Sequence, residues 1–143
     1  MSDNNMKPKT EKPGVHMIVN TTRYRKQYNE LNRKRDDYMP LGPDLERGAR
    51  QCWVVTNEGL SQLDTLSPEN PGTLTAYDGR GNRRGTWKII GYKWTERRDY
   101  LTKELMKTPM GVELILDGRL TGPDAIFWEW DRMPGTGCAI AKI

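Results

Sequence analysis

The sequence predicts an α+β fold: a single domain with a mainly antiparallel sheet of six to seven short strands and two helices. Two stretches, 111–116 and 125–131, alternate apolar and polar residues at a spacing of two, as strands with one buried face do. The helices that the sequence indicates do not alternate regularly with strands, which argues against a doubly wound parallel sheet. The length of 143 residues suits one domain, because domains usually contain ~100–150 residues.

The stretch 111–131 holds the densest group of large apolar residues and is predicted to be the centre of the sheet. Buried aromatic side chains contribute most per residue to a small core. We therefore interpret this stretch as the structural centre of the protein and place the functional contacts elsewhere.

Residues 1–14 are expected to form a polar tail outside the domain, which is assigned to residues 15–143. The tail has three lysines and two prolines, and its only large apolar residues are two methionines. Such a segment should be flexible, or ordered by a partner. Its polarity indicates no secretory signal peptide, and no stretch of the chain approaches the ~20 apolar residues that cross a membrane. We expect a protein of the cytoplasm, or of a particle assembled there, with no membrane partner.

A helix is predicted over 23–38, after a strand at 15–20 and before Pro40. One narrow stripe of this helix is formed by Tyr24, Tyr28, Leu31 and Tyr38. Its other faces carry six basic residues, Arg23, Arg25, Lys26, Arg33, Lys34 and Arg35. The helix either lies on the sheet by its tyrosines or docks on nucleic acid or another subunit, since arginine suits phosphate.

The next segment is predicted to contain one helical turn at 43–47, with proline at its first position, and a strand at 51–56. Residues 57–59 are predicted as a turn. Residues 60–66 are compatible with a strand or a loop, and residues 67–72 form a loop rich in proline and glycine.

A β-hairpin is predicted from 73–78 and 85–94, joined by a long tip. Thr95 should then cap a short helix that runs to about residue 107. The residues expected to face the core from this helix are Tyr100, Leu101 and Leu105. The remaining predictions are a turn at Asp117 and Gly118, a loop at 120–124 and a last strand at 138–143.

The hairpin tip, 79–85, has the sequence GRGNRRG and is the sharpest local feature. Its glycines allow close approach to a ligand, and Arg80, Arg83 and Arg84 can bind phosphates. Tyr77 and Trp87 flank the tip and offer rings on which bases could stack. A strand follows the glycines, whereas dinucleotide and NTP loops need a helix there. The tip is either a solvated turn or a contact to nucleic acid or an acidic protein surface.

Charge is distributed unevenly along the chain. The first 50 residues hold 11 basic and 7 acidic residues, and the remaining 93 hold 12 of each. The whole excess of +4 therefore lies in the first third, which hints at an anionic partner.

The acidic residues near the aromatic strand suggest a metal site only weakly. Asp124 followed by Glu129 partly resembles the acid pair of restriction-type nucleases, but Asp131 stands where those enzymes carry a lysine. His16 is the only histidine, and the spacing of Cys52 and Cys138 is not that of a zinc site. No metal or cofactor is predicted, and the two cysteines are expected to be free thiols.

These features favour a non-enzymatic structural or accessory subunit of a larger macromolecular assembly, such as a virion-type or nucleoprotein particle. It would act through protein–protein contacts, with other subunits bound by the tail and the helix at 23–38. Five tryptophans and six tyrosines against one phenylalanine agree with such contacts. One alternative is a protein that binds DNA or RNA through that helix and the tip. A second is a small metal-dependent hydrolase.

Overall fold

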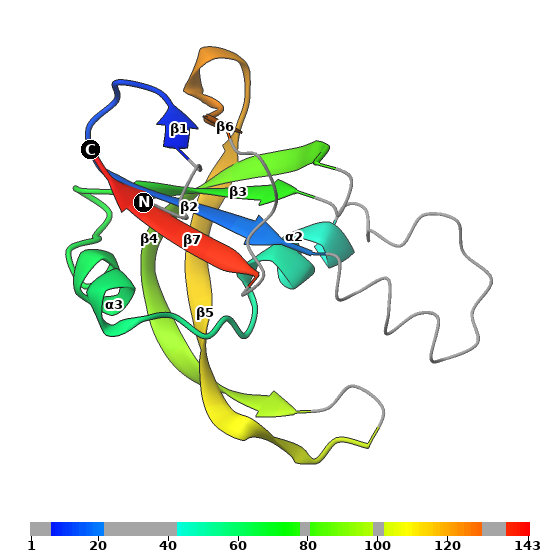
Figure 1. Cartoon of the computed structure of the whole chain (residues 1–143). Helices are drawn as coiled ribbons and strands as arrows, with labels where there is room; N and C mark the ends of the chain where they lie inside the picture. The colour runs from blue at the N-terminus through cyan, green and yellow to red at the C-terminus, as the bar shows by residue number, and fades with distance from the viewer. Residues whose placement is uncertain (1–6, 22–42, 78–80, 99–101, 130–136) are drawn as a thin grey trace, which may run out of the picture.

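The computed structural model describes residues 7–21, 43–77, 81–98, 102–129 and 137–143 (Figure 1). Within these ranges the chain forms seven strands in two sheets and two α-helices. This confirms the predicted α+β fold, in which a mostly antiparallel sheet dominates. The helix predicted over 23–38 lies outside the described residues. No helix in the described ranges is long and apolar enough to cross a membrane.

The main sheet has five strands in the order β5-β4-β3-β2-β7, and β1 and β6 form a separate sheet of two strands. The strands are β1 (Lys7–Lys9), β2 (Val15–Asn20), β3 (Gly72–Tyr77), β4 (Arg83–Arg98), β5 (Leu105–Leu120), β6 (Phe127–Glu129) and β7 (Cys138–Lys142). The helical elements are α2 (Pro43–Arg50), α3 (Asn57–Leu63) and the 3-10 helix η1 (Gly122–Asp124).

Strand β2 lies between β3 and β7 in the main sheet. It pairs in parallel with β3 and antiparallel with β7, while β3–β4 and β4–β5 are antiparallel. The predicted strand at 15–20, the hairpin built on 73–78 and 85–94, and the last strand are confirmed by these pairings.

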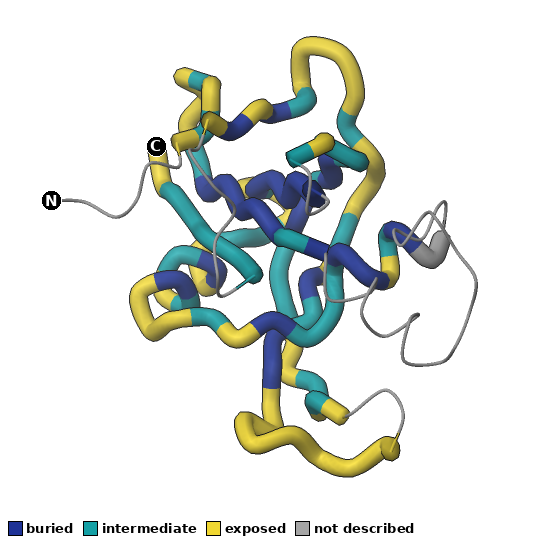
Figure 2. Tube along the Cα trace, turned by 45° about the vertical axis from the view of Figure 1, so that its right-hand side comes forward, coloured by how far each residue is buried: buried dark blue, intermediate teal, exposed yellow. Residues whose placement is uncertain are grey.

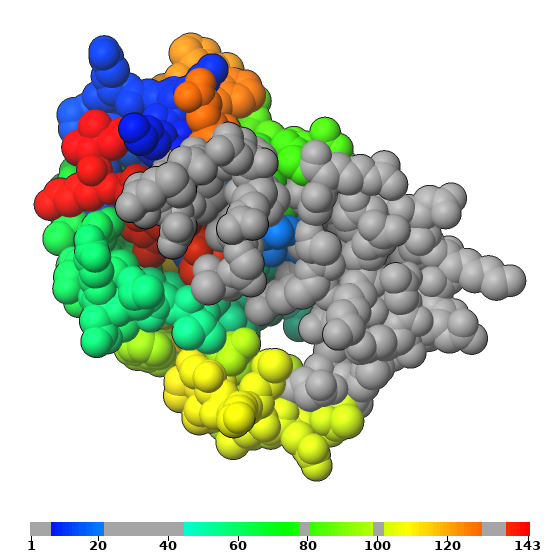
Figure 3. Space-filling view, in the orientation of Figure 1, coloured from blue at the N-terminus to red at the C-terminus, as the bar shows by residue number. Residues whose placement is uncertain are grey.

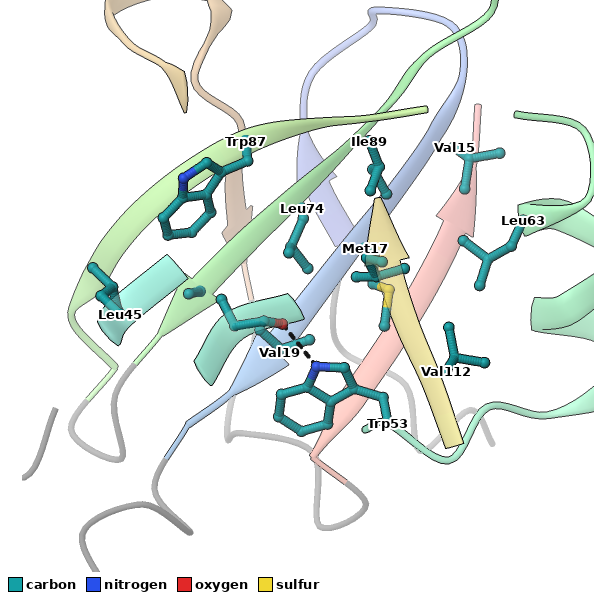
Figure 4. Close-up of a cluster of buried hydrophobic side chains, with 13 residues drawn as sticks. Val15, Met17, Val19, Leu45, Trp53, Leu63, Leu74, Trp87, Ile89 and Val112 are labelled. Carbon is teal, nitrogen blue, oxygen red and sulfur yellow. Dashed lines mark hydrogen bonds between the residues drawn. The ribbon is translucent and has the colours of Figure 1, made fainter. Parts of the chain in front are cut away.

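One face of the main sheet packs on the two helices and forms the larger core (Figure 4). Residues at a spacing of two, such as Val15, Met17 and Val19 on β2, point to this face. The helices close it with Leu45 from α2 and Leu63 from α3. We call this the helix face.

The opposite face of the sheet is unusually polar for a buried surface, and we call it the threonine face. His16, Thr73, Thr75 and Thr86 are all buried there. The residues leading into and within β6 cover it, because Ile126 and Trp128 pack against Ile18 and Tyr77. Buried hydroxyls need partners, and Thr75 Oγ1 lies 3.3 Å from Thr86 Oγ1 and donates to the Ile126 carbonyl at 3.4 Å.

Strand β1 lies inside the segment predicted as a tail. It pairs antiparallel with β6, Lys7 opposite Glu129 and Lys9 opposite Phe127. Lys9 Nζ is 2.6 Å from Glu129 Oε1. The tail was expected to be flexible or ordered by a partner, but its residues 7–9 are held by the chain itself.

Helix α2 starts at Pro43, as predicted, but runs to Arg50, past the single turn expected at 43–47. The strand predicted at 51–56 is wrong. Cys52 has a φ of +66°, which bends the chain, and only Trp53 pairs with a strand, opposite Val112. The Trp53 indole N–H donates to the Ala49 carbonyl at 2.7 Å, so the ring completes the end of α2 instead of extending the sheet (Figure 4).

The turn predicted at 57–59 is also wrong, because these residues open α3, and residues 60–63 continue the helix. Thr56 caps it by accepting a hydrogen bond from the Gly59 amide at 3.1 Å. Gly59 is required for packing: a Cβ there would lie 2.6 Å from Val55 Cγ1 and 3.1 Å from Ile140 Cδ1 of β7. The glycine marks close contact between α3 and the sheet, where the sequence suggested a turn.

The helix predicted from Thr95 to about residue 107 is wrong. Strand β4 continues to Arg98 and β5 already begins at Leu105, so this segment is the outer part of one long hairpin. Local helix propensity is overridden by cross-strand pairing. Pro109 fits within β5 because β5 is an edge strand of the sheet, where a missing N–H is tolerated.

The turn predicted at Asp117 and Gly118 is wrong as well, since both residues lie within β5. Gly118 has a φ of +99°, which a glycine adopts without strain. Asp117 Oδ2 lies 3.4 Å from Lys88 Nζ across the strand pair. The reversal follows at the predicted loop, where η1 occupies residues 122–124.

Candidate interaction surfaces

The structure describes four of the residues predicted to contact a partner, and the others lie outside the described ranges. Those outside are the six basic residues of the predicted helix, Arg23, Arg25, Lys26, Arg33, Lys34 and Arg35, and Arg80 of the tip. The four described are Tyr77, Arg83, Arg84 and Trp87.

These four residues do not share one face of the sheet. Tyr77 is spaced by two from Thr75 and lies on the threonine face, whereas Trp87 is opposite Leu74 in the core of the helix face. Ala76 pairs with Gly85 but Tyr77 pairs with Arg83, so Arg84 is the extra residue of a β-bulge. Tyr77 and Trp87 are each only 3% exposed, so neither ring is open to a stacking base.

Arg83 contacts an exposed ring that the sequence analysis did not assign to the site. Its guanidinium carbon lies 3.7 Å from the centroid of Phe127, which is 50% exposed. The Nη1 atom of Arg83 is buried and has no hydrogen-bond partner within the described part of the chain. Lys9 is opposite Phe127 in the β1–β6 register, and its ammonium pairs with Glu129.

Arg119 braces the bulge from β5. Its guanidinium carbon lies 5.3 Å from the Trp87 ring, and its Nη2 donates to the Arg84 carbonyl at 2.7 Å. Gly85 leaves room for this contact, because a Cβ there would come within 2.9 Å of Arg119 Nη2. The backbone of the predicted tip is thus fixed by an arginine that the sequence analysis did not single out.

The carboxylates considered for metal catalysis are paired separately with bases. Glu129 binds Lys9, and Asp124 Oδ1 lies 4.0 Å from Lys12 Nζ. Glu113 accepts from Arg50 at 3.3 Å. Asp131 lies outside the described residues. Among the described residues no three His, Cys, Asp or Glu side chains are grouped to hold a metal ion.

His16 serves the fold on the threonine face. Its Nε2 donates to the Lys12 carbonyl at 2.9 Å, and its Nδ1 lies 2.8 Å from Thr73 Oγ1. Burial lowers the pKa of His16 below its ordinary 6.5, which favours the neutral ring. Cys52 and Cys138 are free thiols, as predicted. Each lies near a backbone carbonyl, Cys52 Sγ 3.7 Å from that of Glu96 and Cys138 Sγ 3.4 Å from that of Val54.

The largest exposed feature is the outer part of the β4–β5 hairpin, which projects from the body of the protein (Figures 1 and 2). We call described residues 93–98 and 102–110 the arm. The described chain has eight large hydrophobic residues that are exposed, and four of them lie on the arm. These four are Trp94, Leu105, Met106 and Met110. In the space-filling view the arm lies at one edge of the described surface (Figure 3).

The apolar face of the arm is a continuation of the helix face of the sheet. Cross-strand partners share a face, and the register pairs Trp94 with Val112 and Glu96 with Met110. Val112 is buried in the core, whereas Trp94 is 54% exposed. The Trp94 ring meets the Tyr92 ring edge to face at a centroid distance of 6.1 Å. Thus one apolar row runs from the core out along the arm.

Two arginines brace the arm. Arg97 donates to the Cys52 carbonyl at 3.3 Å and to the Thr108 carbonyl at 2.9 Å. Arg98 donates to the Lys103 carbonyl at 2.8 Å and pairs with Glu96 at 3.0 Å. These contacts tie the arm to the body and fix the ends of its turn.

Part of the sequence of the arm is typical of a strand, although another part has the spacing of a helix. Residues 92, 94 and 96 of β4 share a face, and Trp94 is an aromatic at a strand position. The spacing of Leu101 and Leu105 suits a helix equally well, and the sequence alone does not decide between the two.

No protein family matches this sequence, and no curated protein or solved structure shows significant similarity to it.

Proposed function

We propose that the protein is a non-enzymatic structural or accessory subunit of a larger macromolecular assembly and that it acts through protein–protein contacts. The observation that carries this proposal is the arm, a braced hairpin that holds four large apolar side chains out from the body. Contiguous exposed apolar surface is characteristic of interaction sites.

The composition of the arm agrees with an interface. Tryptophan and methionine are enriched where proteins bind one another, and a few such residues contribute most of the binding energy. Trp94, Met106 and Met110 provide residues of these types within one hairpin. The groups considered for catalysis have partners within the fold, which agrees with the proposal: His16 bonds to Thr73 and Lys12, and Glu129 and Asp124 pair with lysines.

The proposal is tested by sedimentation of lysate from the cells that make the protein. Wild-type protein is expected in a fraction much heavier than the 16.5 kDa chain. The double variant Trp94→Ser, Met110→Ser should move to the light fraction, whereas Phe127→Ser, which removes an exposed ring away from the arm, should not. Wild-type protein found only in the light fraction would refute the proposal.

A second candidate function is nucleic-acid binding, which the contact between Arg83 and the exposed Phe127 ring favours. An exposed aromatic ring beside cations is the arrangement on which bases stack. Affinity for a single-stranded oligonucleotide should then fall steeply with salt, and Arg83→Ala should reduce the salt slope by about one phosphate contact. Lys142→Ala on β7 is the control. Salt-independent binding, or none at low ionic strength, excludes this function.

A further inference from the structure

We infer that the arm binds an acidic protein segment whose apolar side chains cover Trp94, Leu105 and Met110. This inference rests on the proposed function and adds the chemistry of the partner. It is derived from the faces, charges and bracing of the arm.

Three of the four exposed apolar side chains of the arm, Trp94, Met110 and Leu105, lie along one face. The register, which shifts between Glu96 and Arg98, pairs Trp94 with Val112, Glu96 with Met110 and Arg98 with Leu105. Trp94 and Leu105 are each about half exposed, so a binding partner could remove substantial further apolar area from water. A partner must therefore supply apolar groups of its own along this row.

The charge of the arm specifies the sign of the partner. The sequence 93–110 has five basic and three acidic residues, a net charge of +2. The basic residues are Lys93, Arg97, Arg98, Lys103 and Lys107, and the acidic ones are Glu96, Asp99 and Glu104. Glu96 pairs with Arg98, and Lys93 Nζ lies 3.9 Å from Glu113 Oε2. The remaining charges are the basic Arg97, Lys103 and Lys107 against the acidic Asp99 and Glu104, which leaves a positive excess. Carboxylates flanking apolar residues complement this excess.

Other occupants fit the surface less well. A second arm would bring like charges together, which opposes binding. A nucleic acid would satisfy the lysines and could stack on Trp94, but it would not cover the aliphatic and thioether side chains of Leu105, Met106 and Met110 with apolar surface. An acidic segment with apolar side chains satisfies both requirements.

The arm is also preorganised for binding. Arg97 holds the Thr108 carbonyl of the outer β5 segment and the Cys52 carbonyl of the body, and Arg98 holds the Lys103 carbonyl near the turn. A surface that is ordered before binding loses less conformational entropy when it meets its partner.

The test is selection of a random peptide display library on the immobilised full-length protein, with counter-selection on Trp94→Ser. Selected peptides are expected to combine Asp or Glu with apolar residues. Trp94→Ser and Met110→Ser should each weaken a selected peptide about tenfold. Lys103→Glu with Lys107→Glu should weaken it severalfold and reduce its salt dependence. Ile115→Ser, which removes an exposed apolar side chain of β5 outside the arm, is the matched control and should leave affinity unchanged. Circular dichroism checks that each variant is folded.

Several outcomes overturn the inference. They are selected peptides without acidic residues, peptides that bind the arm variants equally, and no selected peptide at all. Binding of a single-stranded oligonucleotide at the arm, without peptide binding, would assign the surface to nucleic acid.

If peptide selection fails while the arm variant still leaves the heavy fraction, the acidic partner is wrong and the proposed function stands. If the wild-type protein never sediments as an assembly, the proposed function fails whatever the peptides show.

Discussion

The base and the arm of the β4–β5 hairpin consist of the same two strands, yet they differ in what surrounds them. In the base, which comprises residues 86–92 and 111–120, Ile89 and Leu114 are 0% and 1% exposed, whereas on the arm Trp94 and Leu105 are 54% and 49% exposed. The base is flanked by β3 and covered by the helices, but the arm is a two-stranded ribbon, which has little stability alone. Alternating apolar residues thus specify a strand without specifying whether it is covered.

The largest expected effect is a difference in stability between substitutions of two leucines in the same strand. Leu114→Ala leaves a cavity in the core and should lower the free energy of unfolding by ~2–5 kcal/mol. Leu105→Ala on the arm should change it by less than ~0.5 kcal/mol, because this side chain is half exposed. Urea denaturation of both variants measures the difference. Equal losses would mean that the arm is covered in solution by part of the protein itself.

A medium effect is expected where the base meets the arm. A Cβ at Gly111 would lie 2.8 Å from Arg97 Cδ and 3.0 Å from the Cys52 carbonyl carbon. Gly111→Ala must therefore displace the Arg97 stem or the Cys52 backbone and should cost ~1–3 kcal/mol of stability. Gly91→Ala is the control, since its nearest neighbour is Ile115 Cδ1 at 3.8 Å. A Gly111→Ala protein as stable as Gly91→Ala, by thermal denaturation, would show that Arg97 does not pack across β5.

The smallest effect is pH-dependent and belongs to the body of the protein, because the arm has no histidine. Burial lowers the pKa of His16 in the folded protein, while in the unfolded chain it is near 6.5. The unfolded state therefore binds the proton first as pH falls. The neutral His16 ring contributes its full stabilisation above pH 6.5. This contribution declines below pH 6.5 and stops changing once His16 is protonated in the folded protein as well.

The measurement is the urea midpoint of the wild type and of His16→Gln between about pH 5 and 8. Carboxylates affect both proteins alike, so the difference between the two curves isolates the imidazole. Wild-type stability should fall more steeply below pH 6.5 than that of the variant. Parallel curves would contradict the buried, neutral His16.

The stretch 111–131 is not the centre of the sheet as predicted, because β5 is an edge strand and β6 pairs with β1 in the separate sheet. Two shorter strands of the main sheet could be predicted because they are paired along their whole length. Val15–Asn20 and Cys138–Lys142 are short, bounded by turn residues and paired throughout, so local pattern and tertiary structure agree. The two helices in the described ranges were harder to predict. Gly59 suggests a turn in the sequence, but it is a packing requirement against β7.

The arm could not be predicted from the sequence because its strand character comes from pairing between Trp94 and Val112 and between Glu96 and Met110, not from residue type. Arg83 and Arg84, which were predicted in the tip, are the first two residues of β4, and their contact with a partner stays a prediction. The rings chosen to accompany them, Tyr77 and Trp87, are buried. The exposed ring that contacts Arg83 is Phe127, which is distant from it in sequence. The two residues meet because β6 covers the threonine face.

The position of β2 between β3 and β7 has a consequence for how the protein is made. β2 leaves the ribosome well before its antiparallel neighbour, residues 138–142. Gly14 and Ile143 also exchange two backbone hydrogen bonds of 2.9 Å. Until residues 138–142 have been synthesised, this edge of β2 is open to pairing with other chains. Deletion of residues 138–142 should leave the edge open in the folded protein as well and should cause aggregation.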